Sequence, residues 1–315
     1  MVSGGSGVHV VFGTGPVGRA TAEALLRREI RVRMVNRSGR SPLGERVDVV
    51  AGDARDADFA TRAANGAEAV YQTLNPEYHE WETQFPLLQR GVLAAAQRVG
   101  ARYVAMDNVY SYGDPHGEIL TETSPENPHT RKGRVRKRMA DELWEDHRAG
   151  RVAVTSGRAS DYYGPGAGNA SPIGDPVISA VRKGKRAALF DSPDTVHSYT
   201  FIPDIGEGLA ELGTNDRALG RAWHLPNDPN PRSSRQMVES LARALGTTAK
   251  VTTIPVFALR AVGVINPTVR ELIEMAYEFR SAFVVDSTAI TQEFGLRATP
   301  IDEAWQRTLA AVTAP

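Results

Sequence analysis

The most unusual stretch of the sequence is a basic run, because six of the eight residues from Arg131 to Arg138 are arginine or lysine. Lys132 and Arg136 are four residues apart and would share one face of a helix. A neighbouring cation disfavours the charged form of a lysine, so Lys132 could give or take a proton near neutral pH. Arg136 keeps its proton and is better suited to binding hydroxyl or acidic groups. The alternative interpretation is that both are solvated surface cations.

A basic run can also bind nucleic acid, but the composition argues against this. The 315 residues include 37 Lys plus Arg and 37 Asp plus Glu, which gives a formal net charge of zero. Nucleic-acid-binding domains usually carry a positive excess, and single-strand binders interleave aromatic residues with their cations. We therefore expect a small-molecule substrate and no nucleic acid.

Composition excludes several other kinds of chemistry. The chain has no cysteine, which excludes disulfides, thiol catalysis and Cys-based metal sites. His79 is solitary, and no cluster has the spacing of metal ligands, so we expect no metal. No apolar run approaches the roughly 20 residues of a membrane-spanning helix. The start, MVSGGSG, does not resemble a secretory signal, so a cytoplasmic protein without membrane contact is expected.

A glycine-rich loop suggests a dinucleotide site. Gly13, Gly15 and Gly18 form G-x-G-x-x-G between an apolar run and a helix-forming stretch. In such loops the first glycine permits a tight turn, the second lets the backbone approach a pyrophosphate, and the third lets helix and strand pack closely. The position after a strand and before a helix supports this interpretation over a plain turn. The candidate cofactor-binding residues here are Gly13, Gly15, Pro16, Val17 and Gly18.

The end of the second apolar run bears on which dinucleotide binds. NAD sites usually have Asp or Glu there, whereas an arginine accommodates the 2′-phosphate of NADP. This chain has Asn36 followed by Arg37 and Arg40, which favours NADP and leaves NAD as the alternative if the arginines are merely solvated. Asp53, next to Ala54, could hold the adenine amino group or cap a helix that starts near Asp56.

The elements that position these residues alternate between strand and helix. Apolar runs typical of strands occupy residues 8–12, 32–35, 47–50, 68–72, 102–106 and 151–155, with helices expected at 19–29, 81–99 and after the basic run. This alternation predicts an α/β fold with a doubly wound parallel (Rossmann) sheet. After Gly157, glycine and proline become frequent, and helix-like stretches at 234–245 and 267–280 suggest a smaller, mostly helical lobe. We expect residues 1–160 to form the dinucleotide-binding core. Residues 161–315 would form substrate-lobe elements interleaved with the end of the sheet.

Five motifs together resemble those of the extended short-chain dehydrogenase/reductases, the NAD-dependent epimerase/dehydratase family. They are GTGPVG (13–18), GDARDAD (52–58), MDNVYSYGD (106–114), RASDYYGPG (158–166) and YTFIPDIGEGL (199–209). The resemblance covers nearly the whole chain. It implies a doubly wound domain that carries the cofactor and a small C-terminal lobe that covers the substrate.

The resemblance fails at the family's catalytic positions. The family uses a Tyr-x-x-x-Lys pair before the sixth strand and a Ser or Thr after the fifth. Alignment on the prolines of ETSPENPHTRKGRVRKRMADEL places Lys132 at the tyrosine, Arg136 at the lysine and Asn108 at the serine. A one-residue offset would instead place Gly133 and Lys137 there, so no tyrosine is present in either case. Tyr110, two residues after Asn108, could supply a phenol.

Further residues are placed by the resemblance near the substrate. Tyr78 and Trp81, in LNPEYHEW after the fourth strand, would form an aromatic wall or simply belong to a helix start. The candidate substrate-binding residues are Asn75, Tyr78, Trp81, Asp161 and Tyr162.

Three functions remain open at this point. The first is an NAD(P)-dependent oxidoreductase or epimerase acting on a small polar carbonyl or hydroxyl compound. The second is an NADP(H)-binding sensor or scaffold protein without turnover. The third is a nucleotide-sugar epimerase or dehydratase, with Arg182, Lys183 and Arg186 as a diphosphate clamp. The resemblance also implies a homodimer that pairs the helices near 85–98 and 133–147.

Overall fold

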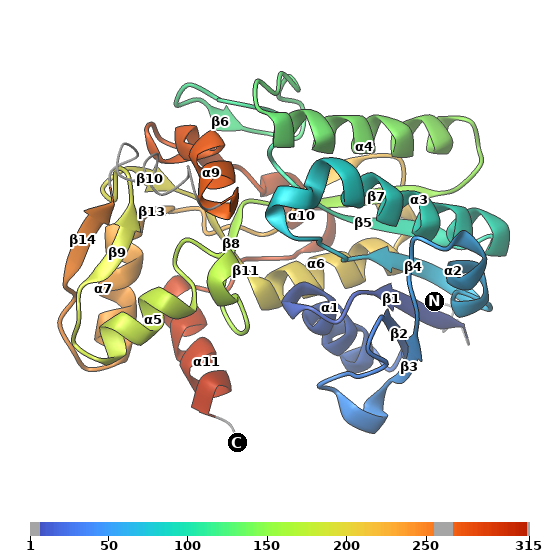
Figure 1. Ribbon diagram of the computed structural model, residues 1–315, viewed down its shortest axis with the longest axis horizontal. Coiled ribbons are helices and arrows are strands. Elements are labelled where there is room, and N and C mark those ends of the chain that lie inside the picture. The colour runs from blue at the N-terminus through green and yellow to red at the C-terminus, as the bar shows by residue number, and fades with distance from the viewer. Residues whose placement is uncertain (1–6, 255–266, 314–315) are drawn as a thin grey trace. The chain divides into compact units, whose positions relative to one another are not determined.

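The chain folds into two compact units, and each unit is assembled from separate stretches of sequence. The computed structural model describes residues 7–254 and 267–313 (Figure 1). The first unit contains residues up to 108, 135–158 and 205–223, and the second contains 109–134, 159–204 and the residues from 224 onward. The chain therefore crosses between the units several times.

The first unit is built around a seven-stranded sheet with the strand order β12-β7-β5-β4-β1-β2-β3. The pairs β1–β2, β1–β4, β2–β3 and β4–β5 run parallel. This is the order of a doubly wound dinucleotide-binding sheet, and it confirms the predicted fold class. The strands are β1 (Val8–Phe12), β2 (Arg31–Asn36), β3 (Asp48–Ala51), β4 (Ala67–Gln72), β5 (Arg102–Asn108), β7 (Val154–Ala159) and β12 (Ala222–His224).

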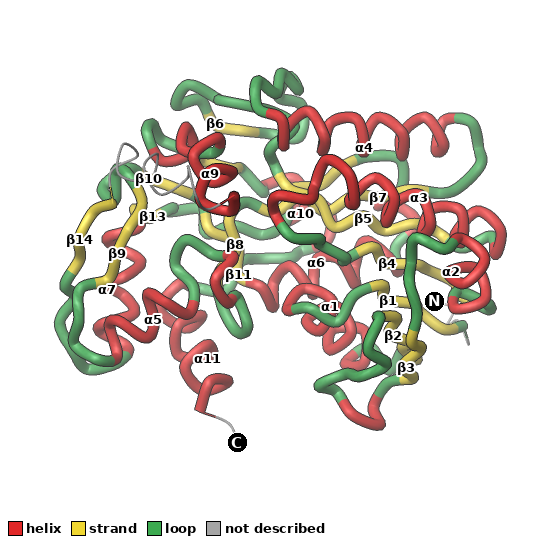
Figure 2. Tube along the Cα trace, viewed as in Figure 1, coloured by secondary structure: helices red, strands yellow, loops and turns green. Residues whose placement is uncertain are grey.

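Helices flank this sheet, as Figure 2 shows. They are α1 (Pro16–Arg27), α2 (Ala57–Ala63), α3 (Trp81–Val99), α4 (Arg131–Arg148) and α6 (Ile202–Thr214). Arg90 Nε on α3 donates to Glu142 on α4 at 3.0 Å, and Arg28 on α1 pairs with Glu207 on α6 at 2.6 Å. Helix α4 is divided between the units, because residues 131–134 belong to the second and the rest to the first.

The strand predictions succeeded where strands are buried on both faces. Every residue of β1 is buried, and Phe12, Val70, Val92 and Val154 share one core cluster. Such strands read as continuous apolar runs in the sequence. The strand expected at 151–155 lies instead at 154–159, because Arg151 and Val152 form a bend that precedes it.

The second unit combines helices with four two-stranded sheets among its described residues. The helices are α5 (Asp175–Arg182), α7 (Ser234–Ala244), α9 (Pro267–Glu274), α10 (Thr288–Phe294) and α11 (Ile301–Thr313). The sheets pair β6 (Ile119–Leu120) with β15 (Val284–Val285), β8 (Asp161–Tyr163) with β11 (Tyr199–Phe201), β9 (Ala187–Phe190) with β14 (Val251–Ile254), and β10 (Val196–His197) with β13 (Arg232–Ser233). Short 3-10 turns occur in both units. In the first unit they are η1 (Gly44–Arg46), η2 (Tyr78–Glu80) and η4 (Asp216–Ala218), and in the second η3 (Gly168–Ala170) and η5 (Ala276–Phe279).

The helical stretches predicted in the second unit are present with altered bounds. Helix α7 begins at a capping box, in which Ser233 and Gln236 bond each other's main-chain N–H groups, as its sequence favours. The stretch expected at 267–280 is divided into α9 and η5. Among the described residues, none of the helices is both long and apolar enough to cross a membrane.

Candidate functional site

Two glycines of the G-x-G-x-x-G loop are required by close packing. Gly13 has a φ of +116°, which side chains rarely adopt, and a Cβ there would lie 2.7 Å from Thr73 Oγ1. A Cβ on Gly18 would overlap the carbonyl oxygen of Gly13 and also lie 2.7 Å from Thr73 Oγ1. The loop therefore brings α1 against the ends of β1 and β4.

Gly15 differs from these two glycines, because it borders open space. A Cβ added to Gly15 would meet no described atom within 4 Å. Gly15 is the N-cap of α1 and makes no side-chain cap hydrogen bond, and Pro16 opens the helix. Main-chain N–H groups at a helix N-terminus and the positive end of the helix dipole suit a phosphate. This cradle fits the pyrophosphate of a dinucleotide.

Asn36 shapes the loop that follows β2. Its Nδ2 donates to Thr14 Oγ1 at 2.8 Å and to the Arg40 carbonyl at 2.6 Å, while its Oδ1 accepts from Gly39 N at 2.7 Å. The side-chain amide of Asn36 is therefore hydrogen-bonded within the protein. Arg37 and Arg40, on the same loop, are exposed.

Asp53 is paired with a neighbouring arginine. Arg55 Nε lies 2.9 and 3.0 Å from its two carboxylate oxygens, and the hydrogen bond from Arg55 holds the pKa of Asp53 below its usual value. The alternative interpretation of Asp53 as a helix cap is wrong. Asp56 caps α2 and accepts from the N–H groups of Asp58 and Phe59.

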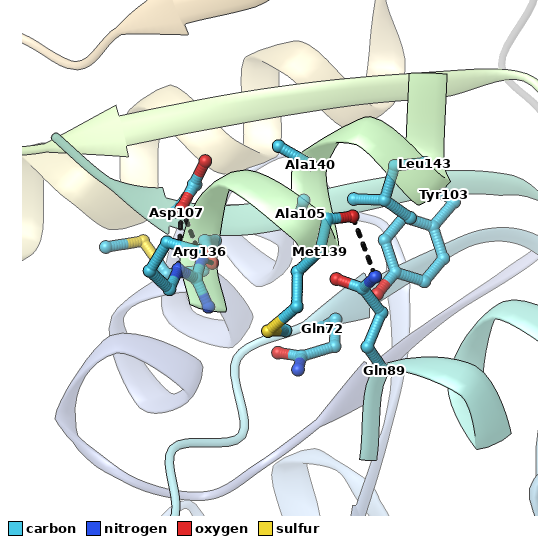
Figure 3. A pocket seen from close by; sticks show the side chains of 10 residues that line it. Gln72, Gln89, Tyr103, Ala105, Asp107, Arg136, Met139, Ala140 and Leu143 are labelled. Carbon is cyan, nitrogen blue, oxygen red and sulfur yellow. Dashed lines mark hydrogen bonds and ion pairs between the residues drawn. The ribbon is translucent and has the colours of Figure 1, made fainter. Parts of the chain in front are cut away.

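Arg136 forms a buried ion pair with Asp107 at the end of β5 (Figure 3). Arg136 Nε donates to Asp107 Oδ1 at 2.8 Å, and Arg158 Nε donates to the other oxygen at 3.2 Å. Asp107 and Arg136 are each 5% exposed. Burial raises the pKa of Asp107, but the charges of Arg136 and Arg158 outweigh it and leave this pKa below its usual value. The Phe85 ring lies 4.5 Å from the guanidinium of Arg136.

A small cavity lies beside this ion pair. It has a volume of about 10 Å³ and is lined by Gln72, Gln89, Tyr103, Asp107, Arg136 and Met139, among others. Gln89 Nε2 donates to the Met139 carbonyl at 2.9 Å, the dashed contact beside Gln89 in Figure 3. This volume corresponds to about one water molecule, so the cavity is too small for a nicotinamide or a sugar.

Lys132 also forms a buried ion pair with a carboxylate, and both partners belong to the second unit. Its Nζ lies 2.5 Å from Glu271 Oε2, and Arg131 Nη2 lies 2.8 Å from the other oxygen. The main-chain N–H of Lys132 donates to Glu274 at 3.1 Å. Burial raises the pKa of Glu271, but the hydrogen bond and charge of Lys132, followed by Arg131, leave it below its usual value.

These pairs correct one interpretation of the basic run. Lys132 and Arg136 are buried and paired with carboxylates, so they are not solvated surface cations. The ammonium group of Lys132 contacts Glu271 directly. The remaining arginines of the run, Arg131, Arg134 and Arg138, are exposed.

Asn108 and Tyr110 follow the ion pair along the chain, and both are half-buried. The main-chain N–H of Asn108 donates to Asp107 Oδ1 at 2.8 Å. The carbonyl of Tyr110 accepts from Gly113 N at 3.2 Å. A Cβ on Gly133 would lie 2.5 Å from this carbonyl, which explains a glycine at that helix position.

The aromatic candidates form a cluster at the start of α3. The rings of Tyr78 and Trp81 are 5.0 Å apart and nearly perpendicular, and Phe85 lies 5.2 Å beyond Trp81. Trp81 is buried, Tyr78 is half-buried and Asn75 is exposed.

Asp161 and Tyr162 are half-buried on β8 of the second unit. Asp161 Oδ2 lies 3.1 Å from His197 Nε2. Burial, then the negative charge of Asp161, raise the pKa of Tyr162.

The sequence analysis missed the two carboxylates that hold the central cations. Asp107 is a charged residue at the end of the otherwise apolar strand segment YVAM, and this contrast could have indicated it. Glu271 is 139 positions from Lys132, and no local pattern connects the two.

Comparison with known proteins supports the fold. The model of the NAD dependent epimerase/dehydratase family matches residues 8–223. UDP-glucuronic acid decarboxylase 4 of Arabidopsis thaliana is 32% identical over 128 residues, which span 38% of this chain and 29% of the decarboxylase.

Two solved structures show the same fold at low identity. UDP-N-acetylglucosamine 4-epimerase from Bacillus cereus aligns with a TM-score of 0.78 and 12% identity over 98% of both chains. UDP-glucose 4-epimerase from Thermus thermophilus, solved with NAD, aligns with a TM-score of 0.75 and 18% identity over 98% of this chain and all of that chain. The protein described here is a Rossmann-fold protein. It belongs to the NAD-dependent epimerase/dehydratase family.

Proposed function

We propose that this protein is an NAD(P)-dependent oxidoreductase or epimerase that acts on a small polar carbonyl or hydroxyl compound. The observation that carries the proposal is the glycine cradle, in which Gly13 and Gly18 close the strand–helix turn and Gly15 faces open space. A bound nicotinamide dinucleotide supplies hydride exchange with such compounds.

The residues that would hold the cofactor come from three loops of the first unit. Residues 13–18 would bind the pyrophosphate, and Asp53 with Ala54 would lie at the adenine. Arg37 and Arg40 would bind the 2′-phosphate, and their exposure beside an Asn36 that lacks a carboxylate favours NADP over NAD.

Proton transfer is assigned to Lys132. Its ammonium group can donate a proton to a substrate oxygen, while the contact with Glu271 Oε2 keeps the side chain in one orientation. Arg136 remains cationic and would bind ribose hydroxyls or an acidic group. Asn108 would hydrogen-bond the substrate, and Tyr110 is the alternative proton donor.

Nucleotide sugars are the first substrate class to test. UDP-sugars appear in the names of the decarboxylase and of both epimerases above. Exposed cations at Arg182, Lys183 and Arg186, at and after the end of α5, could bind a diphosphate. Asn75, Tyr78, Trp81, Asp161 and Tyr162 are the proposed substrate contacts.

Binding of NADP(H) without turnover is the second candidate function. It is favoured by the two buried ion pairs, which occupy the positions where the family resemblance implies a tyrosine and a lysine.

Turnover by Lys132 variants tests the proposal. NADP(H) is incubated with UDP-sugars and with a panel of small carbonyls and alcohols, and cofactor absorbance and sugar products are followed. Lys132→Met should reduce turnover roughly 10²–10⁴-fold with little change in NADP(H) affinity. Tyr110→Phe is the control.

The outcomes separate the candidates. An inactive Tyr110→Phe beside an active Lys132→Met moves the proton transfer to Tyr110. Cofactor binding without turnover of any compound favours the second function. No binding of either dinucleotide rejects both functions.

A further inference from the structure

The second unit contains a buried group of titratable side chains that cofactor binding does not explain. Asp161 lies on β8, His197 on β10 and Glu278 on η5. His197 and Glu278 are 1% and 2% exposed, and the Asp161 side chain is 15% exposed. We propose that these three residues form an acid–base cluster that holds two exchangeable protons.

The first proton follows from the hydrogen bonds of His197. Its Nδ1 lies 3.2 Å from the main-chain carbonyl of Glu278. A carbonyl only accepts, so Nδ1 carries a hydrogen. Nε2 of a neutral ring would then present a lone pair to Asp161 Oδ2, 3.1 Å away. Neither atom has a hydrogen-bond partner among the described residues. Two facing lone pairs repel at this distance, so we infer that one of the two atoms carries a proton, as imidazolium with carboxylate or as imidazole with carboxylic acid.

The surroundings of His197 hold its ring in this orientation. The ring stacks on Phe279 at 4.8 Å and 3° and on Phe283 at 5.3 Å and 18°. Aromatic faces exclude water and favour a positive charge on the ring between them. The two contacts fix the plane of the ring.

The second proton follows from the position of Glu278. Its Oε1 is buried and accepts no hydrogen bond from the described residues. A carboxylate whose hydrogen bonds do not offset its burial is costly, and such groups become neutral instead. Burial, then the negative charge of Asp161, raise the pKa of Glu278 well above its usual value. Protonated Glu278 beside the protonated pair gives a cluster with no net charge.

The other titratable groups around the cluster do not compete for these protons. Burial raises the pKa values of Tyr162 on β8 and Tyr199 on β11, so both phenols remain neutral. A hydrogen bond with Tyr277 on η5 lowers the pKa of Glu278, but burial and the charge of Asp161 outweigh this effect. Arg232, opposite His197 in the β10–β13 pair, lies 3.1 Å from Asp302.

Side-chain NMR tests the shared proton directly in the full chain. The seven histidines are labelled with ¹⁵N and the aspartates with ¹³C, and His197→Gln and Asp161→Asn identify the two signals. At pH 7 we expect either a protonated Nε2 on His197 or a protonated carboxyl on Asp161. Glu278→Gln should leave these signals unchanged, since glutamine is neutral like the protonated acid. An ionised Asp161 beside a His197 without a proton on Nε2 overturns the proposal.

Stability against pH tests the second proton. Because the folded-state pKa of Glu278 is raised, its contribution is complete below the unfolded-state pKa and is lost as pH rises toward the folded-state value. The urea concentration at the midpoint of unfolding should therefore decrease in the natural chain as the pH rises from 5 to 8. The decrease should be smaller in Glu278→Gln. Circular dichroism verifies that the variant folds. An equal fall in both proteins rejects the proton on Glu278.

Discussion

The pairing of Arg136 with Asp107 places two charges in the interior of the first unit, where each residue is 5% exposed. Burying an ion costs several kcal/mol, and the cost is offset only when geometry and additional hydrogen bonds are good. Arg136 meets these conditions, because its Nη2 also donates to the Met106 carbonyl at 3.1 Å and a Phe85 ring lies beneath it. The arginine is therefore held rigidly at the end of β5.

Replacing Asp107 with asparagine should strongly destabilise the protein. The change leaves the buried guanidinium of Arg136 without its carboxylate, and breaking a buried pair in this way typically costs about 3–5 kcal/mol. Urea denaturation followed by circular dichroism measures the loss.

Arg90→Gln is the matched control for Asp107→Asn. It removes a second arginine–carboxylate pair of the first unit, but Arg90 is largely exposed, so less than about 1 kcal/mol is expected. Similar losses in the two variants would show that burial does not determine the strength of the Arg136 pair.

Arg37 should determine the preference between the two dinucleotides. A charge-assisted hydrogen bond is worth about 1.5–3 kcal/mol, so Arg37→Ala should weaken NADPH binding by about tenfold or more. NADH lacks the 2′-phosphate, and its affinity should not change. Isothermal titration calorimetry with both dinucleotides measures this difference, and Arg40→Ala shows whether the second arginine shares the contact. Tighter binding of NADH by the natural chain would contradict the assignment.

At the scale of elements, the turn from β1 to α1 separates packing from binding. Gly18 is enclosed by main-chain atoms of Gly13, whereas Gly15 faces open space. Gly18→Ala should therefore lower the melting temperature and abolish dinucleotide binding, because α1 must move away from β1. Gly15→Ala should retain the melting temperature and weaken binding, because its methyl group would project toward the phosphate. Melting curves measure the stability of the two variants, and calorimetry measures their dinucleotide affinity. An unchanged affinity in Gly15→Ala would show that the phosphate does not bind at this glycine.

The elements that could be predicted from sequence are those with a local pattern. The apolar runs of β1 and β4 and the amphipathic α3 and α7 all lie near their predicted residues. The pairs β6–β15 and β10–β13 have strands of only two residues, too short for any alternation to appear. The expectation of a mostly helical lobe was incomplete for this reason.

The candidate site was predictable to a similar degree. The glycine loop combines a motif with its context, so it could be placed from sequence. The burial of Lys132 and Arg136 could not, because an uninterrupted basic run gives no sign of which cations meet distant carboxylates. Leu143, on the helix that the sequence analysis expected to pair in a homodimer, lies in the core cluster of the first unit.

At the scale of the whole molecule, we propose a homodimer that uses α3 and α4. Leu87 on α3 is 45% exposed, and Ile119 of β6 is the other large apolar side chain exposed among the described residues, at 59%. Light scattering at micromolar concentration should show a dimer that Leu87→Glu converts to a monomer. Ile119→Glu is the control and should leave the dimer intact. A monomeric natural chain would reject the proposal.

Helix α6 and strand β12 follow the other elements of the first unit in the sequence, and this position has a consequence for synthesis of the protein on the ribosome. Gly206 and Gly213 of α6 lie directly against Ala20 and Tyr71, so closely that no side chain would fit between them. These partners emerge well over a hundred residues apart, and closing so long a loop is slow. Although β1 leaves the ribosome long before α6 and β12, the first unit cannot complete its fold until residue 223 has also left it. Until α6 has been synthesised, the surface of α1 that packs against it stays exposed and accessible to chaperones.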